Sequence, residues 1–284
     1  MLASAGATAV GRASWHAGLV VASANPSIGE RMQSTQSTPA QRTGRFPRVS
    51  WTILLLTSLG IALYFPLQYT QGSLEALIPR NVGLASTYAN RPLAVQVAFY
   101  AHITFAGLAL LVGPFQFSKT IRSRHVRVHH VIGRIYITSV AIGGTAAFVM
   151  SFFSSVEFLG FFGFGSLAIL WVVVTLRAYR AIRRGDVASH QAWMMRSFAL
   201  TYAAPTLRLW LFALLIPQLL LGVPFAQAYS NAYAPVPFLS WLPNLVIVEL
   251  MIRRRGLPAL RLDPSPGAPQ LPAPGSEVRP SAAR

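Results

Sequence analysis

The feature that most constrains the fold of this sequence is a series of long apolar segments, each near the roughly 20 residues that a helix needs to cross a bilayer. They cover approximately Val49–Tyr69, Leu93–Phe117, His129–Phe152, Phe158–Tyr179, Ala192–Pro217 and Pro237–Ile252. The last of them is the shortest, and Pro243 interrupts it. Apolar runs of this length are typical of membrane helices. We therefore expect an all-α fold, a polytopic membrane helix bundle of about six transmembrane helices.

The composition also indicates lipid as the main solvent. Hydrophobic residues make up 53% of the chain and charged residues only 11%, whereas soluble domains average roughly 25% charged residues. The net charge of +17 is compatible with nucleic-acid binding. The basic residues flank the apolar segments rather than covering a polar face, so we expect the lipid bilayer and no nucleic acid as a partner. The chain has no cysteine, which excludes disulfides, thiolate metal sites and thiol catalysis.

The charges between the apolar segments predict the orientation of the bundle. With both termini in the cytoplasm, the inner loops and flanks carry sixteen basic residues and the outer loops only Arg80 and Arg91. Membrane proteins concentrate Lys and Arg on the cytoplasmic side. We therefore predict a multi-pass protein of the cell inner (plasma) membrane with an even number of spans and both termini cytoplasmic.

The ends of the chain differ in composition from the middle. Residues 1–48 are rich in Ala, Ser, Thr and Gly, and residues 257–284 are rich in Pro, so both are predicted to be disordered tails around a helical bundle at 49–256. Met32 is an alternative start of translation. The outer loop at 71–92 either forms a short cap or lacks regular structure.

Two polar residues are predicted to share a layer in the outer half of the membrane. At about 1.5 Å per residue, His102 lies about 22 Å from the cytoplasmic end of its helix. Arg208 lies about 24 Å from the same edge. Charged and titratable side chains at such depth usually have a function. We expect a buried pair or a binding site there.

A second polar layer is predicted at the inner edge of the membrane. His129 and His190 lie at this edge, and Arg134, Arg196 and Glu249 follow about one turn deeper. Glu249 is the one acidic residue in a predicted span, so we expect it to pair with Arg196. Arg134 and Arg196 can alternatively extend to the lipid headgroups.

The helical period adds faces to these layers. Small residues share a face with His102 (Ala106, Ala109 and Gly113) and with His129 (Gly133, Gly143 and Ala147). Such stripes serve close helix packing or leave room for a flat ligand. His190 and Arg208 are eighteen residues apart, which on one continuous helix places them on one face.

These residues resemble a known family. The resemblance rests on His102 with Gly107 and the Gly113–Gln116 run, His129 with Gly133, Arg134 and Tyr136, Trp171, the run His190–Ser197, and Arg208. The pattern resembles the bacterial membrane proteins grouped as domain of unknown function 2306. It extends over roughly Leu93–Leu214 and implies a multi-pass helical bundle. It implies no activity.

The first functional hypothesis is a b-type haem or quinone-linked redox protein. Helical bundles can hold haem b between histidines of facing helices, with His129 and His190 here as the metal ligands and Arg134 and Arg196 beside the propionates. In the outer layer, His102 and Arg208 suit a single ligand or a quinone headgroup.

Two other hypotheses stay open. Intramembrane His, Arg and Glu residues also line the paths of proton and small-anion transporters. Alternatively, the chain is a non-catalytic membrane scaffold or sensor, whose basic Lys119–Arg134 hairpin binds anionic lipid headgroups or an acidic protein surface. Whether the chain is an enzyme stays open as well.

Overall fold

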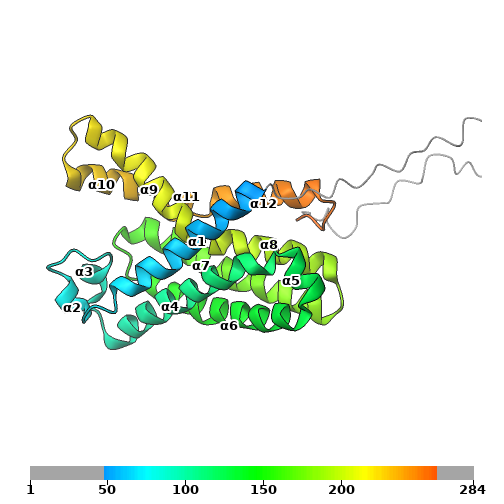
Figure 1. Cartoon of the computed structure of the whole chain (residues 1–284). Coiled ribbons are helices and arrows are strands. Elements are labelled where there is room, and N and C mark those ends of the chain that lie inside the picture. The colour runs from blue at the N-terminus through cyan, green and yellow to red at the C-terminus, as the bar shows by residue number, and fades with distance from the viewer. Residues whose placement is uncertain (1–47, 261–284) are drawn as a thin grey trace, which may run out of the picture. The chain divides into compact units, whose positions relative to one another are not determined.

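The computed structural model describes residues 48–260, and within that range every regular element is a helix (Figure 1). The helices are α1 (Arg48–Gln68), α2 (Leu74–Leu77), α3 (Ala85–Tyr88), α4 (Leu93–Gln116), α5 (Lys119–Arg124), α6 (Val126–Ser151), α7 (Glu157–Arg183), α8 (Val187–Thr201), α9 (Ala203–Leu220), α10 (Phe225–Tyr233), α11 (Val236–Leu239) and α12 (Leu242–Arg254). Six stretches of this range are long and apolar enough to cross a membrane. The predicted all-α membrane bundle is confirmed. The two predicted tails fall almost entirely outside the described residues.

Large apolar side chains cover the outside of the spans. Leu56 and Leu63 on α1 are 61% and 52% exposed, and Leu209 on α9 is 64% exposed. A continuous apolar surface of this kind is unfavourable in water and favourable against lipid tails. The exposed faces therefore agree with a protein embedded in a bilayer.

Helices α4 and α6 pack closely along their small-residue stripes. A Cβ atom added to Gly143 of α6 would lie 3.1 Å from the backbone nitrogen of Ala106 in α4. A Cβ added to Gly113 of α4 would lie 2.5 Å from the ring of Phe198 in α8 and 3.3 Å from the ring of Tyr136 in α6. Small residues at these positions let α4 pack closely against its neighbours. The stripes therefore serve helix packing in this fold.

The predicted fifth span, Ala192–Pro217, is wrong as a single helix. The chain forms α8 and α9, which meet at Tyr202. Pro205 has no N–H to donate to the carbonyl of Thr201, and its ring crowds that carbonyl, so the helix bends there. The prediction that His190 and Arg208 share one helix face is also wrong, because His190 lies on α8 and Arg208 on α9, on different sides of the bend.

The sixth predicted span is also interrupted, as its proline indicated. Helix α11 ends at Leu239 and α12 begins at Leu242, so that Pro243 lies in the first turn of α12. A proline is tolerated in a first turn because its missing N–H would have no intrahelical partner. Together the two helices provide one span, Val236–Arg254.

The loop between α1 and α4 forms a small cap. Leu74 and Leu77 of α2 and Tyr88 of α3 are buried against Phe99 of α4, and the Tyr88 and Phe99 rings stack at 5.0 Å between centroids. Gly83 turns with a φ of +48° directly beside the Tyr69 hydroxyl, which leaves no room for a side chain. Of the two predictions for this loop, the cap is confirmed.

Basic residues gather at one end of the bundle, which we name the basic end. It contains α5, the turn between α7 and α8 and the end of α12, whereas α2, α3 and α10 lie at the opposite, or far, end (Figure 1). Its basic residues include Lys119, Arg122, Arg124, Arg127, Arg180, Arg183, Arg184, Arg253, Arg254 and Arg255. The structure thus places the predicted inner charges together, and which side of the membrane they face stays a prediction.

Candidate functional site

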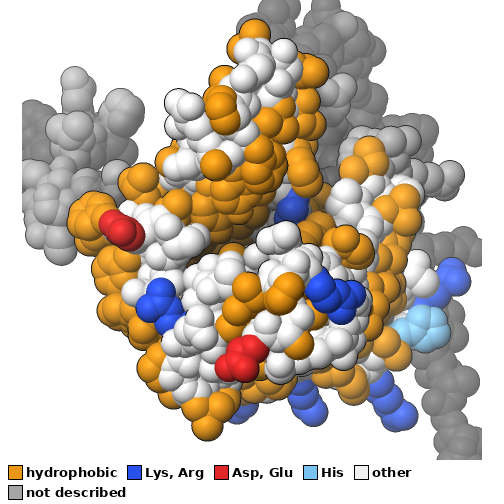
Figure 2. Space-filling model, turned by 90° about the vertical axis from the view of Figure 1, so that its left-hand side faces the viewer, with side chains coloured by type: hydrophobic (Ala, Val, Ile, Leu, Met, Phe, Trp, Pro, Cys, Tyr) orange, Lys and Arg blue, Asp and Glu red, His pale blue; other side chains and the backbone are white. Residues whose placement is uncertain are grey.

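A cavity of about 280 Å³ lies in the half of the bundle nearer the far end. Residues of α1, α3, α4, α6, α7, α8, α9 and α10 line it, and most of them are apolar. Figure 2 looks onto the far end and shows a hollow there, walled by hydrophobic side chains with one basic side chain in it. The polar side chains that line the cavity include His102, Arg208, Thr201, Tyr69, Tyr88 and Tyr233.

The ring of His102 is held in one tautomer by α6. Its Nδ1 atom lies 2.9 Å from the carbonyl oxygen of Gly143. A carbonyl oxygen only accepts hydrogen bonds, so Nδ1 carries the proton and Nε2 keeps its lone pair. Gly143 makes this contact possible, because the absence of a side chain brings the α6 backbone up to α4. His102 thus offers the cavity an acceptor nitrogen.

Arg208 brings a positive charge to the same cavity. Its guanidinium carbon lies 3.9 Å from the centroid of the Phe65 ring, and its Nη1 donates to the carbonyl oxygen of Ala204 at 2.8 Å. No carboxylate among the described residues pairs with it. A charge in an apolar site is costly unless a partner compensates it. The cavity is therefore suited to a ligand that accepts hydrogen bonds from a cation.

Three tyrosines at the cavity were missed by the sequence analysis. Tyr69, Tyr88 and Tyr233 lie in or beside short helices and loops, and their spacing gives no signal. The Tyr69 hydroxyl accepts a hydrogen bond from the Leu84 N–H at 2.8 Å. Burial raises the pKa of Tyr69 and Tyr233, and it raises the pKa of Tyr88 to about 12. All three are therefore neutral near pH 7 and add no negative charge beside Arg208.

Beneath the cavity, a chain of hydroxyl groups joins α6, α7 and α8. The Thr175 hydroxyl donates to the Trp171 carbonyl oxygen at 2.7 Å, so it accepts from Ser197 at 2.6 Å. Ser197 then accepts from Tyr136 at 2.8 Å, the Tyr136 and Thr201 hydroxyl oxygens lie 2.6 Å apart, and Thr201 donates to the Ser197 carbonyl oxygen at 3.0 Å. The Trp171 indole N–H also donates to Thr201, at 2.9 Å. Each hydroxyl group of this network has a hydrogen-bond partner, and a fully bonded network of this kind holds α6, α7 and α8 rigidly together beneath the cavity.

The two histidines predicted as metal ligands lie toward the basic end. Nδ1 of His190 lies 2.9 Å from the carbonyl oxygen of Ala178, so its Nε2 also keeps a lone pair. Nδ1 of His129 is buried without a hydrogen-bond partner. No hydrogen bond joins the two rings, and residues 48–260 contain no cluster of three or more His, Cys, Asp or Glu side chains arranged for a metal ion.

Arg196 and Glu249 form the predicted ion pair. Arg196 is 3% exposed, and its Nε and Nη2 atoms donate to the Glu249 carboxylate at 3.0 and 2.8 Å. Glu249 also accepts from the backbone N–H of Leu260 at 2.8 Å. The pair therefore joins α8, α12 and the segment after α12. Arg134, in contrast, is exposed on α6.

Comparisons with known proteins give one match. A family model described as "Predicted membrane protein (DUF2306)" matches residues 99–252, which include all six predicted site residues. No curated protein and no solved structure matches the chain.

Proposed function

Because the chain belongs to the DUF2306 family of predicted membrane proteins, whose description names no activity, we propose a function from the cavity alone. The chain binds the headgroup of a lipid-soluble quinone between His102 and Arg208. The observation that supports this is the pairing, in one apolar cavity, of an acceptor nitrogen with a cation that has no described carboxylate partner.

The chemistry of the two side chains fits a quinone and its quinol. Arg208 donates hydrogen bonds, which a quinone carbonyl oxygen accepts. The free Nε2 of His102 accepts a hydrogen bond, which a quinol hydroxyl donates. Arg208 would therefore bind either form, whereas the neutral imidazole of His102 would bind only the quinol, from whose hydroxyl it would receive a proton when the quinol is deprotonated.

The size and wall of the cavity fit the same ligand. Ligand pockets commonly measure about 300–1,000 Å³, so about 280 Å³ suits a single substituted ring. Most of the side chains that line the cavity are apolar, and they include the rings of Phe65 and Phe99. An isoprenoid tail would leave the headgroup site along such walls toward lipid.

Calorimetric titration of the purified protein in nanodiscs with a short-tailed benzoquinone, and with its quinol under reducing conditions, tests this function. Arg208→Gln should weaken binding of both at least about tenfold, since a hydrogen bond to a charged group contributes roughly 1.5–3 kcal/mol. His102→Ala should weaken binding of the quinol roughly twofold to tenfold, since a neutral hydrogen bond contributes about 0.5–1.5 kcal/mol. The matched control is Arg80→Gln, because Arg80 is exposed at the far end and contacts Gln71. Equal dissociation constants for all four proteins would contradict the proposal.

One observation favours a second candidate function, haem b binding at His129 and His190. Metal-bound histidines usually donate their other ring N–H to a carbonyl, as His190 does to Ala178. Arg196, however, already binds Glu249 and is not free for a propionate. This candidate predicts a Soret band that is lost in His129→Ala and in His190→Ala, and a colourless protein would exclude it. Transport of protons or a small anion stays a prediction.

We also propose that the basic end faces the cytoplasm of a cell whose inner membrane holds the protein. The ten basic residues named for this end would then contact anionic lipid headgroups, which attract Lys and Arg at the cytoplasmic surface. A reporter that folds only in the cytoplasm, fused to the C-terminus, should be active. Activity of a reporter that folds only outside the cytoplasm would contradict this orientation.

A further inference from the structure

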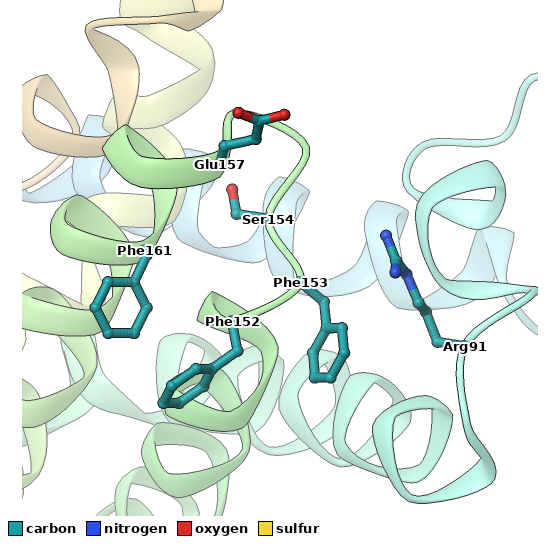
Figure 3. Close-up of a pocket in the computed structure, with 6 residues that line it drawn as sticks. All are labelled: Arg91, Phe152, Phe153, Ser154, Glu157 and Phe161. Carbon is teal, nitrogen blue, oxygen red and sulfur yellow. The ribbon is translucent and has the colours of Figure 1, made fainter.

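A second pocket, of about 470 Å³, opens at the far end between the segment before α4 and the loop that joins α6 to α7. Figure 3 shows the six residues that line it: Arg91, Phe152, Phe153, Ser154, Glu157 and Phe161. Arg91 and Glu157 thus line one pocket from separate segments together with three phenylalanines, and the Glu157 carboxylate points away from the rings (Figure 3). Neither charged side chain takes part in a salt bridge among the described residues.

The guanidinium of Arg91 is held in place before any ligand binds. Its Nε donates to the carbonyl oxygen of Thr87 at 3.2 Å, and its guanidinium carbon lies 5.5 Å from the centroid of the Phe153 ring. These contacts leave both Nη atoms available to an external acceptor. Two N–H groups in a fixed fork match a phosphate or carboxylate.

Glu157 is held in place by the backbone at the start of α7. Its φ is +43°, a left-handed conformation that is uncommon for a residue with a side chain. Its N–H donates to the carbonyl oxygen of Ser154 at 3.2 Å, which closes the turn. Its carboxylate is exposed and has no hydrogen-bond partner in the described part of the chain. Strained backbone conformations cluster at functional sites, so the positive φ of Glu157 indicates a binding role for this residue.

The aromatic side of the pocket continues onto the lipid-facing surface. The Phe152 and Phe161 rings lie 4.9 Å apart between centroids, and Phe152 is 59% exposed. The pocket lies where the span Val126–Ser151 ends and the span Glu157–Arg183 begins. Arg91 lies two residues before the start of the span Leu93–Gln116. In a bilayer crossed by these spans, its charged groups would lie near the lipid headgroups and its rings near the first acyl carbons.

We propose that this pocket binds the headgroup of a zwitterionic aminophospholipid, with the phosphate at Arg91 and the primary ammonium at Glu157. The acyl chains would lie against Phe152 and Phe161. The terminal glycerol of a phosphatidylglycerol headgroup is neutral and brings no positive charge to Glu157, and the quaternary amine of phosphatidylcholine has no N–H to donate to it. The two charges thus select phosphatidylethanolamine over both.

Native mass spectrometry of the full chain tests this selection. The protein is reconstituted with equal amounts of phosphatidylethanolamine, phosphatidylglycerol and phosphatidylcholine, and the lipids that stay bound after detergent extraction are counted. The wild type should retain phosphatidylethanolamine preferentially. Glu157→Gln should remove its preference over phosphatidylglycerol, and Arg91→Gln should weaken retention roughly tenfold, as expected for losing a charged hydrogen-bonded partner. Arg80→Gln, another exposed arginine of the far end, should match the wild type.

Two results would overturn the proposal: equal retention of the three lipids by the wild type, or unchanged preference in both Arg91→Gln and Glu157→Gln. If Glu157→Gln does not fold, Glu157→Asn replaces it, because Asn tolerates a positive φ. The proposal does not rest on quinone binding. Neither pocket variant should alter the benzoquinone dissociation constant, so failure of one proposal is distinguishable from failure of the other.

Discussion

The Nδ1 atom of His102 on α4 donates a hydrogen bond to the carbonyl oxygen of Gly143 on α6, over 2.9 Å. This contact links packing to chemistry, since the close approach of two helices also determines the tautomer of the ring. Nε2 is left as an acceptor at the wall of an apolar cavity that Arg208 also lines. The proposed quinone site therefore depends on a glycine that touches no ligand.

Gly143→Ala tests this dependence. Its Cβ would lie 3.1 Å from the Ala106 backbone nitrogen, which cannot move independently of α4. The two helices should separate slightly, which lowers stability by about 1–3 kcal/mol and, by weakening the hydrogen bond that orients His102, weakens binding of the benzoquinol. Thermal unfolding in detergent and calorimetric titration measure the two effects. Gly60→Ala is the control, because nothing lies within 4 Å of its added Cβ; a loss of binding in that variant would contradict the account.

Tyr136→Phe should destabilise the bundle without changing ligand affinity strongly. The variant removes the hydroxyl between Ser197 and Thr201 and leaves buried polar groups without a partner, which costs roughly 1–3 kcal/mol. Unfolding in increasing SDS reports the loss. Tyr179→Phe, whose hydroxyl contacts the exposed Arg183, should have little effect. Equal stability of the two variants would show that the hydroxyl chain does not hold α6 to α8.

Glu249→Gln should be among the most destabilising single changes at the basic end. It leaves the buried Arg196 guanidinium without its carboxylate, and breaking a buried pair costs about 3–5 kcal/mol. The double variant Arg196→Met with Glu249→Leu should recover much of this loss, because no buried charge is then unpaired. Glu75→Gln, at an exposed position on α2, serves as the control. A double variant as unstable as Glu249→Gln would argue against a buried ion pair.

The turn before α8 predicts a dependence of stability on pH. Hydrogen bonds from the Ser189 hydroxyl and backbone N–H lower the pKa of Asp186, whose carboxylate lies 2.9 Å from that backbone nitrogen. Because the pKa is lower in the folded state, the stabilisation is complete above the unfolded value of about 3.9 and is lost as pH falls through the folded value.

Asp186→Asn keeps the capping hydrogen bond without the charge. The wild type should therefore have the higher Tm at pH 7, and the difference should vanish in acid. A difference in Tm that stays constant or grows on acidification would contradict this assignment.

Much of the fold could be predicted from local properties of the sequence. The spans follow from the length of apolar runs, and the clustering of charges at one end follows from the loops between them. Glu249 could be paired with Arg196 because it was the one acid in any predicted span. The bend at Tyr202 was missed because the apolar run continues through Pro205, and the length of a run does not report a missing backbone hydrogen bond.

The candidate site was less accessible to prediction. Depth along a helix placed His102 and Arg208 in one layer, because it depends only on position in the chain. It could not show that Gly143 of α6 receives the His102 hydrogen bond, since that depends on how α4 and α6 pair. Tyr69, Tyr88 and Tyr233 come from loops and short helices, whose positions follow from tertiary packing rather than from a period. Arg91 and Glu157 line one pocket for the same reason.

Photolabelling with an azidobenzoquinone, followed by mapping of the adducts by mass spectrometry, tests whether a quinone headgroup binds between His102 and Arg208. Adducts are expected on cavity residues of α4 and α9; unmodified benzoquinone should displace the label, and Arg208→Gln should abolish the adducts. Adducts spread over the lipid-facing side chains of α1 and α7, undiminished by unmodified benzoquinone or by Arg208→Gln, would contradict it.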